Sequence, residues 1–202
     1  MSVEKRAIRR DLRARRKRLS GAFVEAASEE VCARLRRLPA FPRAASVVAY
    51  LADENEIALG SLLAEVAESG RELFLPKNVS GPALIRWRLG VPVTVGRGGV
   101  LEPSEGVPEI PPSPVVALLP MVAWDETGTR LGRGGGFYDR LFASGAEAVV
   151  RVGLAYEFQE YPGLPRDPWD VSVHYVITER RIVCCGQHRR NASPLQKGGL
   201  QP

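Results

Sequence analysis

The run "VVALLP" at residues 115–120 decides the fold class of this chain. An uninterrupted apolar run of this length, rich in branched residues, is typical of a strand that is buried on both faces. Similar runs occur in "SVVAYL" (46–51), "ELFLPK" (72–77) and "AVVRVGLAY" (148–156). Because helical segments alternate with these strands, the chain is predicted to be an α/β domain with a mostly parallel central sheet.

The remaining elements follow from apolar spacing and from glycine and proline signals. Helices are predicted over residues 3–19, 22–38, 57–70 and 136–145, and more strands over 83–89 and 172–179. The stretch 90–114 is rich in Gly and Pro and predicts mostly irregular loop. Ligands of such folds bind at the carboxyl ends of the strands, where "DENE" (53–56) and a glycine loop both lie.

Length and composition indicate one soluble globular domain of 202 residues. We expect a single domain over 1–183 and a flexible tail over 184–202, which lacks apolar periodicity. No apolar run approaches the ~20 residues that span a bilayer, and no apolar segment follows the basic start. A cytoplasmic protein without a membrane partner is therefore predicted. Three cysteines, Cys32, Cys184 and Cys185, suggest no disulfide framework.

The net charge of +5 is concentrated at the start of the chain. Residues 1–19 carry nine Lys and Arg against two acidic residues, whereas the rest carries 19 basic and 21 acidic residues. A basic first helix on a nearly neutral body leaves two partner classes open, an anionic small molecule and a nucleic acid.

The glycine loop "RLGRGGGFYDR" (130–140) matches neither the P-loop nor the dinucleotide pattern. Its glycines would nevertheless let backbone N–H groups approach an anion, and Arg130 and Arg133 suit phosphate. Asp139 beside such a cradle suggests that Mg²⁺ accompanies the phosphate. An ordinary glycine turn, with Asp139 favoured by the helix dipole, is the alternative that spacing leaves open.

The longer segment "LLPMVAWDETGTRLGRGGGFYDR" (118–140) resembles the signature of the 5-formyltetrahydrofolate cyclo-ligase family. Supporting matches occur in order along residues 4–180: "KRAIRRDLRARRKRLS", "VVAYLADENEI", "ELFLPK", "GGVLEP", "VGLAYEFQ" and "LPRDPWDVSVHYVITE". The resemblance implies a three-layer α/β sandwich of the sugar-phosphate isomerase and CoA-transferase type. It also implies conversion of 5-formyltetrahydrofolate to 5,10-methenyltetrahydrofolate with ATP and Mg²⁺, through phosphorylation of the formyl oxygen and release of ADP and phosphate.

The resemblance also implies site residues. ATP contacts carry over to Lys5, Arg6, Arg9, Arg130, Leu131, Gly132, Arg133, Gly134, Gly135, Gly136, Phe137 and Tyr138. Folate contacts carry over to Leu51, Glu56, Arg133, Gly134, Gly135, Gly136 and Phe137. Arg133 and Asp139 would carry the catalysis, and Asp139 and Asp170 would hold the metal, with Asp167 as a competitor. Lys5 and Arg9 lie one helical turn apart, so both can reach one polyphosphate.

Some positions depart from the family pattern. Gly135 stands where some members have a lysine, a loss that Arg133 would offset in part, and Phe137 replaces the first of two tyrosines. Trp124 and Phe137 would either stack on the pterin or fill the core. Two other functions stay open: a nucleic-acid-binding protein using the basic helix, and a relative that binds folate or nucleotide without ligase activity. A monomer or weak dimer is expected.

Overall fold

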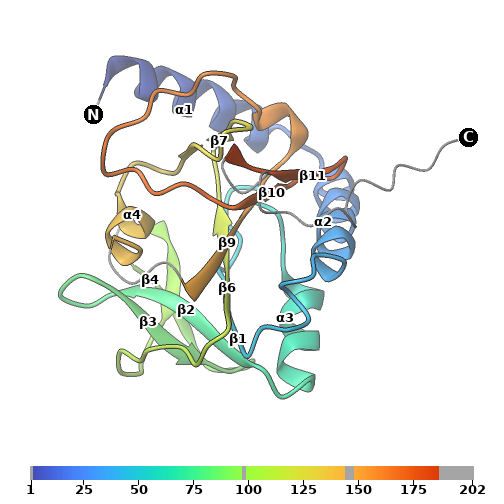
Figure 1. The fold of residues 1–202 in the computed structure, drawn as a ribbon, viewed down its shortest axis with the longest axis vertical. Coiled ribbons are helices and arrows are strands. Elements are labelled where there is room, and N and C mark those ends of the chain that lie inside the picture. The colour runs from blue at the N-terminus through green and yellow to red at the C-terminus, as the bar shows by residue number, and fades with distance from the viewer. Residues whose placement is uncertain (1, 97–98, 144–147, 187–202) are drawn as a thin grey trace, which may run out of the picture.

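The computed structural model describes residues 2–96, 99–143 and 148–186. Its centre is a seven-stranded sheet in the order β11-β10-β9-β6-β1-β2-β3 (Figure 1). These strands are β1 (Ser46–Val48), β2 (Glu72–Asn78), β3 (Pro82–Trp87), β6 (Val115–Pro120), β9 (Val149–Leu154), β10 (Tyr175–Ile177) and β11 (Ile182–Cys184). The five inner strands are parallel and the two edge strands are antiparallel to their neighbours. The predicted α/β class with a mostly parallel sheet is therefore confirmed.

Strand β6 explains why its sequence is apolar throughout. It pairs with β1 on one side and with β9 on the other, and its first five residues are buried. Val116 and Leu118 contribute to one core, and Ala117 and Leu119 to the core on the opposite face. Both faces of the strand therefore require apolar side chains.

Helices cover both faces and one end of the sheet (Figure 1). The helices are α1 (Val3–Lys17), α2 (Gly21–Arg36), α3 (Gly60–Glu68) and α4 (Phe137–Leu141), with a 3₁₀ turn at Glu157–Gln159. Side chains of α2 and α3 belong to one core, whereas those of α4 belong to the other. Ser2 and Ser20 cap α1 and α2 by accepting hydrogen bonds from the backbone N–H groups of Lys5 and Phe23. Helix α1 contributes Ile8 to a small third core around the strands β7 (Ala123–Trp124) and β8 (Arg130–Leu131).

The structure differs from the sequence predictions where elements are short. The hairpin β7–β8 follows β6, and its strand β8 contains the first two residues of the glycine loop. The stretch 90–114 contains β4 (Val93–Val95) and β5 (Leu101–Pro103). Two or three residues are too few to produce a periodic pattern, so these strands give no sequence signal.

Residues just beyond the expected domain boundary at residue 183 still take part in the fold. Strand β11 ends at Cys184, and Cys185 is buried. Residues 187–202 lie outside the described residues, as does 144–147, where the helix that begins at Phe137 was predicted to end. Within the part of the chain that the structure describes, no helix has the length and apolar character needed to cross a membrane.

Candidate active site

A cavity of about 970 Å³ opens at the carboxyl ends of β1, β2 and β6. Its walls include Tyr50 and Leu51 after β1, Pro76 and Asn78 at the end of β2, and Pro120 at the end of β6. Helix α1 and the whole glycine loop from Arg130 to Arg140 complete the lining. The location is the one expected for ligands of an open, mostly parallel sheet.

One face of α1 supplies the cationic wall. Lys5, Arg9 and Arg13 line the cavity, and their spacing of four residues places them on one side of a helix. Arg6 is exposed and absent from the lining, because a helix turns by about 100° from one residue to the next. The predicted ATP contact of Arg6 therefore lacks support from its position, whereas Lys5 and Arg9 face the cavity as predicted.

Lys5 is buried and bridges two carboxylates. Its Nζ donates to Asp167 Oδ2 at 2.8 Å and to Asp170 Oδ2 at 2.7 Å. Burial alone would lower the pKa of Lys5, but the hydrogen bonds to Asp167 and Asp170 outweigh it and raise that pKa. Burial likewise opposes ionisation of Asp170, but the Asp167 N–H and Lys5 hold the pKa of that carboxyl below its usual range. Lys5 and Asp170 are therefore both charged at neutral pH.

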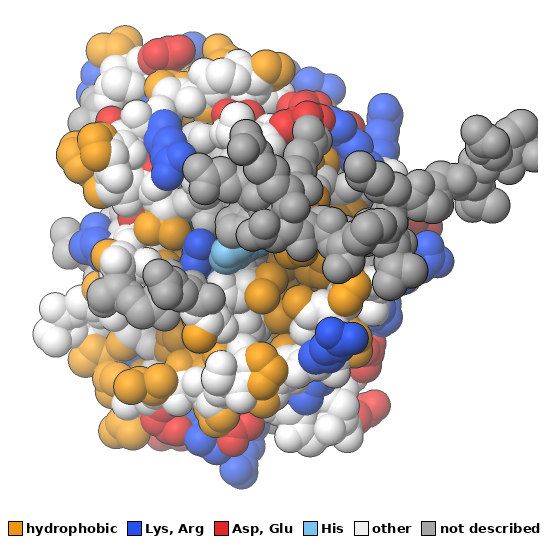
Figure 2. Space-filling model, viewed as in Figure 1, with side chains coloured by type: hydrophobic (Ala, Val, Ile, Leu, Met, Phe, Trp, Pro, Cys, Tyr) orange, Lys and Arg blue, Asp and Glu red, His pale blue; other side chains and the backbone are white. Residues whose placement is uncertain are grey.

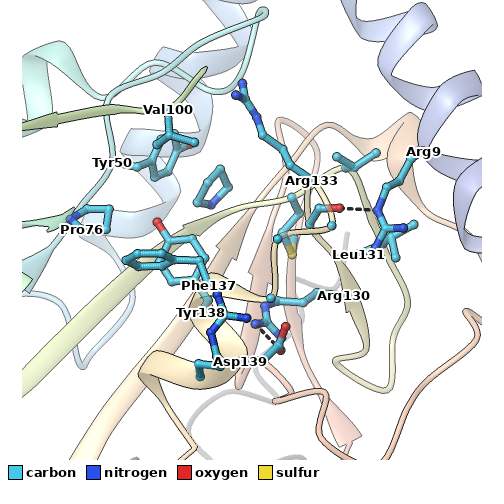
Figure 3. Close-up of a pocket in the computed structure, with 18 of the residues that line it drawn as sticks. Arg9, Tyr50, Pro76, Val100, Arg130, Leu131, Arg133, Phe137, Tyr138 and Asp139 are labelled. Carbon is cyan, nitrogen blue, oxygen red and sulfur yellow. Dashed lines mark hydrogen bonds and ion pairs between the residues drawn. The ribbon is translucent and has the colours of Figure 1, made fainter. Parts of the chain in front are cut away.

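The glycine loop is fixed at its base by Arg130. This buried side chain donates from Nη2 to Asp139 Oδ1 at 2.7 Å and from Nη1 to the carbonyl of Val171. Asp139 Oδ1 also accepts from the backbone N–H of Val171 at 3.1 Å. Arg9 Nε donates to the carbonyl of Gly132 at 2.7 Å (Figure 3). The loop that would hold a phosphate is thus tied both to α1 and to the segment that carries Asp170.

The glycines of the loop are not equivalent. Gly134 and Gly136 have φ of 104° and 62°, in the region that favours glycine. Gly132 and Gly135 are not in that region, and a Cβ at either position would meet nothing within 4 Å. The structure therefore requires glycine for backbone reasons at Gly134 and Gly136, whereas Gly135 has room for the lysine that some family members carry.

Arg133 and Glu56 meet deeper in the cavity. Arg133 Nε lies 3.3 Å from Glu56 Oε1, and the buried Arg16 approaches the same oxygen from α1 at 3.4 Å. Burial is the main influence on Glu56 and raises the pKa of its carboxyl, although Arg16 and Arg133 oppose the rise. Glu56 is thus a nearly enclosed carboxylate held between two guanidinium groups.

The opposite wall of the cavity is apolar. Tyr50, Pro76, Val100 and Phe137 lie together on the side away from Arg9, with Arg133 between the two groups (Figure 3). Trp124 is fully buried and donates from Nε1 to the carbonyl of Tyr156. Trp124 therefore fills the core, and of the two aromatic candidates only Phe137 borders the cavity.

The carboxylates predicted to hold a metal line this same cavity. Asp139 is paired with Arg130, and Asp170 and Asp167 are paired with Lys5. Across residues 2–96, 99–143 and 148–186, no three His, Cys, Asp or Glu side chains converge as a ready-made metal site. The donors still fit Mg²⁺ in kind, because this ion binds through one or two carboxylates together with phosphate oxygens.

Most of the predicted site residues line one cavity: Lys5, Arg9, Leu51, Glu56, Arg130 to Asp139, and Asp170. The cavity is also lined by residues that were not predicted from the sequence: Arg13, Tyr50, Asp53, Val100 and the exposed Trp169. Two of these residues could have been found from the sequence: Arg13 by its helical spacing from Arg9, and Asp53 by its closeness to Glu56. Tyr50 and Trp169 lie in segments that resemble the family, "VVAYLADENEI" and "LPRDPWDVSVHYVITE", but no local pattern marks either residue. Val100 comes from a distant loop.

Comparison with known proteins agrees with this geometry. Residues 1–179 match the model of the 5-formyltetrahydrofolate cyclo-ligase family. The chain is 29% identical to a 5-formyltetrahydrofolate cyclo-ligase of Haemophilus influenzae, over 88% of this chain and 99% of that protein. It is 26% identical to the Escherichia coli K12 protein of the same name, over 85% and 98% of the two chains.

Solved structures lead to the same family. The NMR structure of Aquifex aeolicus 5,10-methenyltetrahydrofolate synthetase is 34% identical, with a TM-score of 0.73 over 89% of this chain and 92% of that chain. A Mycoplasma pneumoniae 5,10-methenyltetrahydrofolate synthetase, 20% identical, shares the fold with a TM-score of 0.66 over 88% and 99% of the two chains. The match over residues 1–179 and the likeness to the Aquifex aeolicus protein show that the chain belongs to the 5-formyltetrahydrofolate cyclo-ligase family, a family of ligases.

Proposed function

We propose that this protein converts 5-formyltetrahydrofolate to 5,10-methenyltetrahydrofolate and consumes ATP, with Mg²⁺, in doing so. One observation carries the proposal: a single cavity joins a cationic wall and a glycine loop to a buried carboxylate and an apolar wall. The cationic wall and the glycine loop suit a polyphosphate. The buried carboxylate and the apolar wall suit a pterin with its hydrogen-bond donors. The proposal includes the sandwich architecture of the sugar-phosphate isomerase type, a cytoplasmic location and a monomer or weak dimer.

The nucleotide end is built from Lys5, Arg9, Arg130 and the loop residues Gly132 to Gly136. Lys5 and Arg9 would bind phosphate oxygens, and the loop N–H groups would surround them at close range. Asp139 and Asp170, with Asp167 nearby, would hold Mg²⁺, which supplies positive charge to the transferring phosphoryl group. These carboxylates and cations neutralise one another, so Mg²⁺ and ATP are expected to bind far better together than apart.

The folate end is built from Leu51, Glu56 and Phe137. The Glu56 carboxylate would accept hydrogen bonds from the pterin, and Phe137 with its apolar neighbours would cover the ring system. Arg133 lies between the two ends, beside Glu56, where the formyl group and the terminal phosphate would meet.

The chemistry follows in two steps. The formyl oxygen attacks the terminal phosphorus of ATP, and ADP leaves, which converts a poor leaving group into a phosphate ester. The neighbouring folate N–H nitrogen then attacks the activated carbon and loses its proton. The C–O bond breaks, and inorganic phosphate takes up a proton and departs as the five-membered ring closes. Arg133 would stabilise the charge on the transferring phosphoryl group, a role that matters more because Gly135 provides no lysine.

Nucleic-acid binding is the weaker alternative. Most cations of α1 point inward or have carboxylate partners, since Lys5 pairs with Asp170, and Arg13 and Lys17 with Glu54. On the face shown in Figure 2, Lys and Arg side chains lie in separate spots instead of one continuous patch. A continuous basic surface is the footprint that sequence-independent nucleic-acid binding requires.

The test is to mix the purified protein with 5-formyltetrahydrofolate, ATP and Mg²⁺ and to record the ultraviolet absorbance of the methenyl product. Product should form only when all three are present. Asp139→Asn should reduce turnover far more than it reduces the melting temperature, and Glu56→Gln should mainly raise the KM for folate. Absence of ATP-dependent product at high enzyme concentration would refute the proposal. Folate and nucleotide binding without turnover would instead indicate a relative that has lost the ligase reaction.

A further inference from the structure

The proposed reaction assigns no role to Asp53, yet its carboxylate lies closer to the Arg133 guanidinium than those of Glu54 and Glu56. Its Oδ2 accepts a hydrogen bond from Arg133 Nη2 at 2.7 Å, and Glu56 Oε1 lies 3.3 Å from Arg133 Nε. Two carboxylates therefore hold two different nitrogens of one guanidinium group. Because the group is planar, these two contacts define its orientation, and neither of them uses the donors on Nη1.

The backbone that carries Asp53 is fixed unusually firmly. The next two residues, Glu54 and Asn55, have φ of 50° and 58°, a strained conformation for residues other than glycine. Helix α1 holds this turn, since Arg13 and Lys17 pair with the Glu54 carboxylate and Arg16 donates to the Glu54 carbonyl.

The turn brings the carboxylates of Asp53 and Glu56 to the same guanidinium group. The Asp53 N–H also donates to Glu56 Oε2 at 3.2 Å, which links the two acidic residues directly.

We propose that Asp53 is a positioning residue: it orients the Arg133 guanidinium between the nucleotide and folate ends and keeps it from closing fully on Glu56. This inference rests on the proposed function. Without the Asp53 charge, Glu56 becomes the nearest strong acceptor for Arg133. Arg133 then moves toward Glu56, and the carboxylate that should receive the pterin becomes occupied.

Orientation, and not stability, is what Asp53 contributes. About two-fifths of its side chain is exposed, and so is about a fifth of that of Arg133. Ion pairs with this exposure stabilise a fold only slightly. A misplaced catalytic guanidinium, in contrast, reduces turnover strongly, because small errors in geometry cost large factors in rate.

The test compares Asp53→Asn with the wild type in the methenyl-product assay. Asp53→Asn should lower kcat/KM for 5-formyltetrahydrofolate by about ten- to a hundredfold, the range expected for lost positioning. The KM for ATP should stay within about twofold, because the phosphate contacts of Lys5 and Arg9 are intact. Asp53→Glu should restore part of the loss. Glu65→Gln is the matched control, since Glu65 forms a similarly exposed pair with Arg36 at 2.6 Å and does not line the cavity.

A double-mutant cycle makes the test specific. In an Arg133→Met background, adding Asp53→Asn should cause no further loss, because Asp53 acts through Arg133. Equal losses in both backgrounds would overturn the inference, as would an Asp53→Asn variant with wild-type kinetics. An inactive wild type would refute the proposed function itself, whereas an active wild type with an unaffected Asp53→Asn variant refutes only this inference.

Discussion

Replacing Arg16 by Met is expected to destabilise the protein strongly. The Arg16 side chain is 1% exposed, and its guanidinium donates to the carbonyls of Glu54 and Met121 and lies 3.4 Å from Glu56. Removing one partner of a buried ion pair costs about 3–5 kcal/mol. Glu56 keeps Arg133 as a partner, and the Met121 carbonyl still accepts from Gln159, so the lower end, about 3 kcal/mol, applies.

The measurement is urea unfolding followed by circular dichroism, with thermal unfolding as a second readout. A loss of about 3 kcal/mol corresponds to a drop of about 6–12 °C in Tm for a domain of this size. Arg10→Met is the control, because Arg10 is exposed on α1 and pairs with its neighbour Asp11. Arg10→Met should change the unfolding free energy by less than about 0.5 kcal/mol. If Arg16→Met changes the unfolding free energy as little as Arg10→Met does, Arg16 does not anchor α1 to the segment 53–56.

Three further predictions concern the glycine loop, the Glu54 carboxylate and the thiol of Cys32. Gly134→Ala should lower the unfolding free energy by about 1–2 kcal/mol because its φ is 104°, whereas Gly135→Ala should be neutral or stabilise by up to about 1 kcal/mol; equal effects in urea unfolding would contradict this. Burial would raise the pKa of the Glu54 carboxyl, but hydrogen bonds from Lys17 and Arg13 outweigh burial and lower this pKa to about 2. The wild type should therefore be more stable than Glu54→Gln above about pH 4.3, and the difference should disappear as the pH falls toward 2. A stability difference that does not depend on pH would refute this prediction. Burial raises the pKa of Cys32 to about 11, so its thiol should resist alkylation at pH 8 in the native protein and react once urea unfolds it; rapid labelling of the native protein would show that Cys32 is accessible.

Local pattern was enough to predict the inner strands of the sheet and the shared helix face of Lys5 and Arg9. The apolar run at Val115–Pro120 predicted a strand buried on both faces, and β6 is such a strand. The turn geometry of a helix predicted that Lys5 and Arg9 share a face, and both line the cavity. In each case the information lies in a few neighbouring residues.

Contacts between distant segments of the chain could not be predicted from the local sequence pattern. The nine cations of the first 19 residues look alike in sequence, yet Arg16 is buried among carbonyls and Arg10 is exposed. Which cation is buried depends on where the 53–56 segment packs, and that is set by the tertiary fold. For the same reason, the local sequence pattern could not predict that Asp53 pairs with Arg133 and Glu54 with Arg13 of α1.

We expect ATP to activate the formyl oxygen, so that ring closure expels this oxygen as phosphate. The most direct measurement uses 5-formyltetrahydrofolate with ¹⁸O in the formyl group, together with ATP and Mg²⁺, and follows both the methenyl absorbance and the mass of the released phosphate. We expect one ¹⁸O atom in each phosphate, formed in step with the methenyl product. Methenyl product accompanied by unlabelled phosphate, or no ATP-dependent product, would contradict the claim.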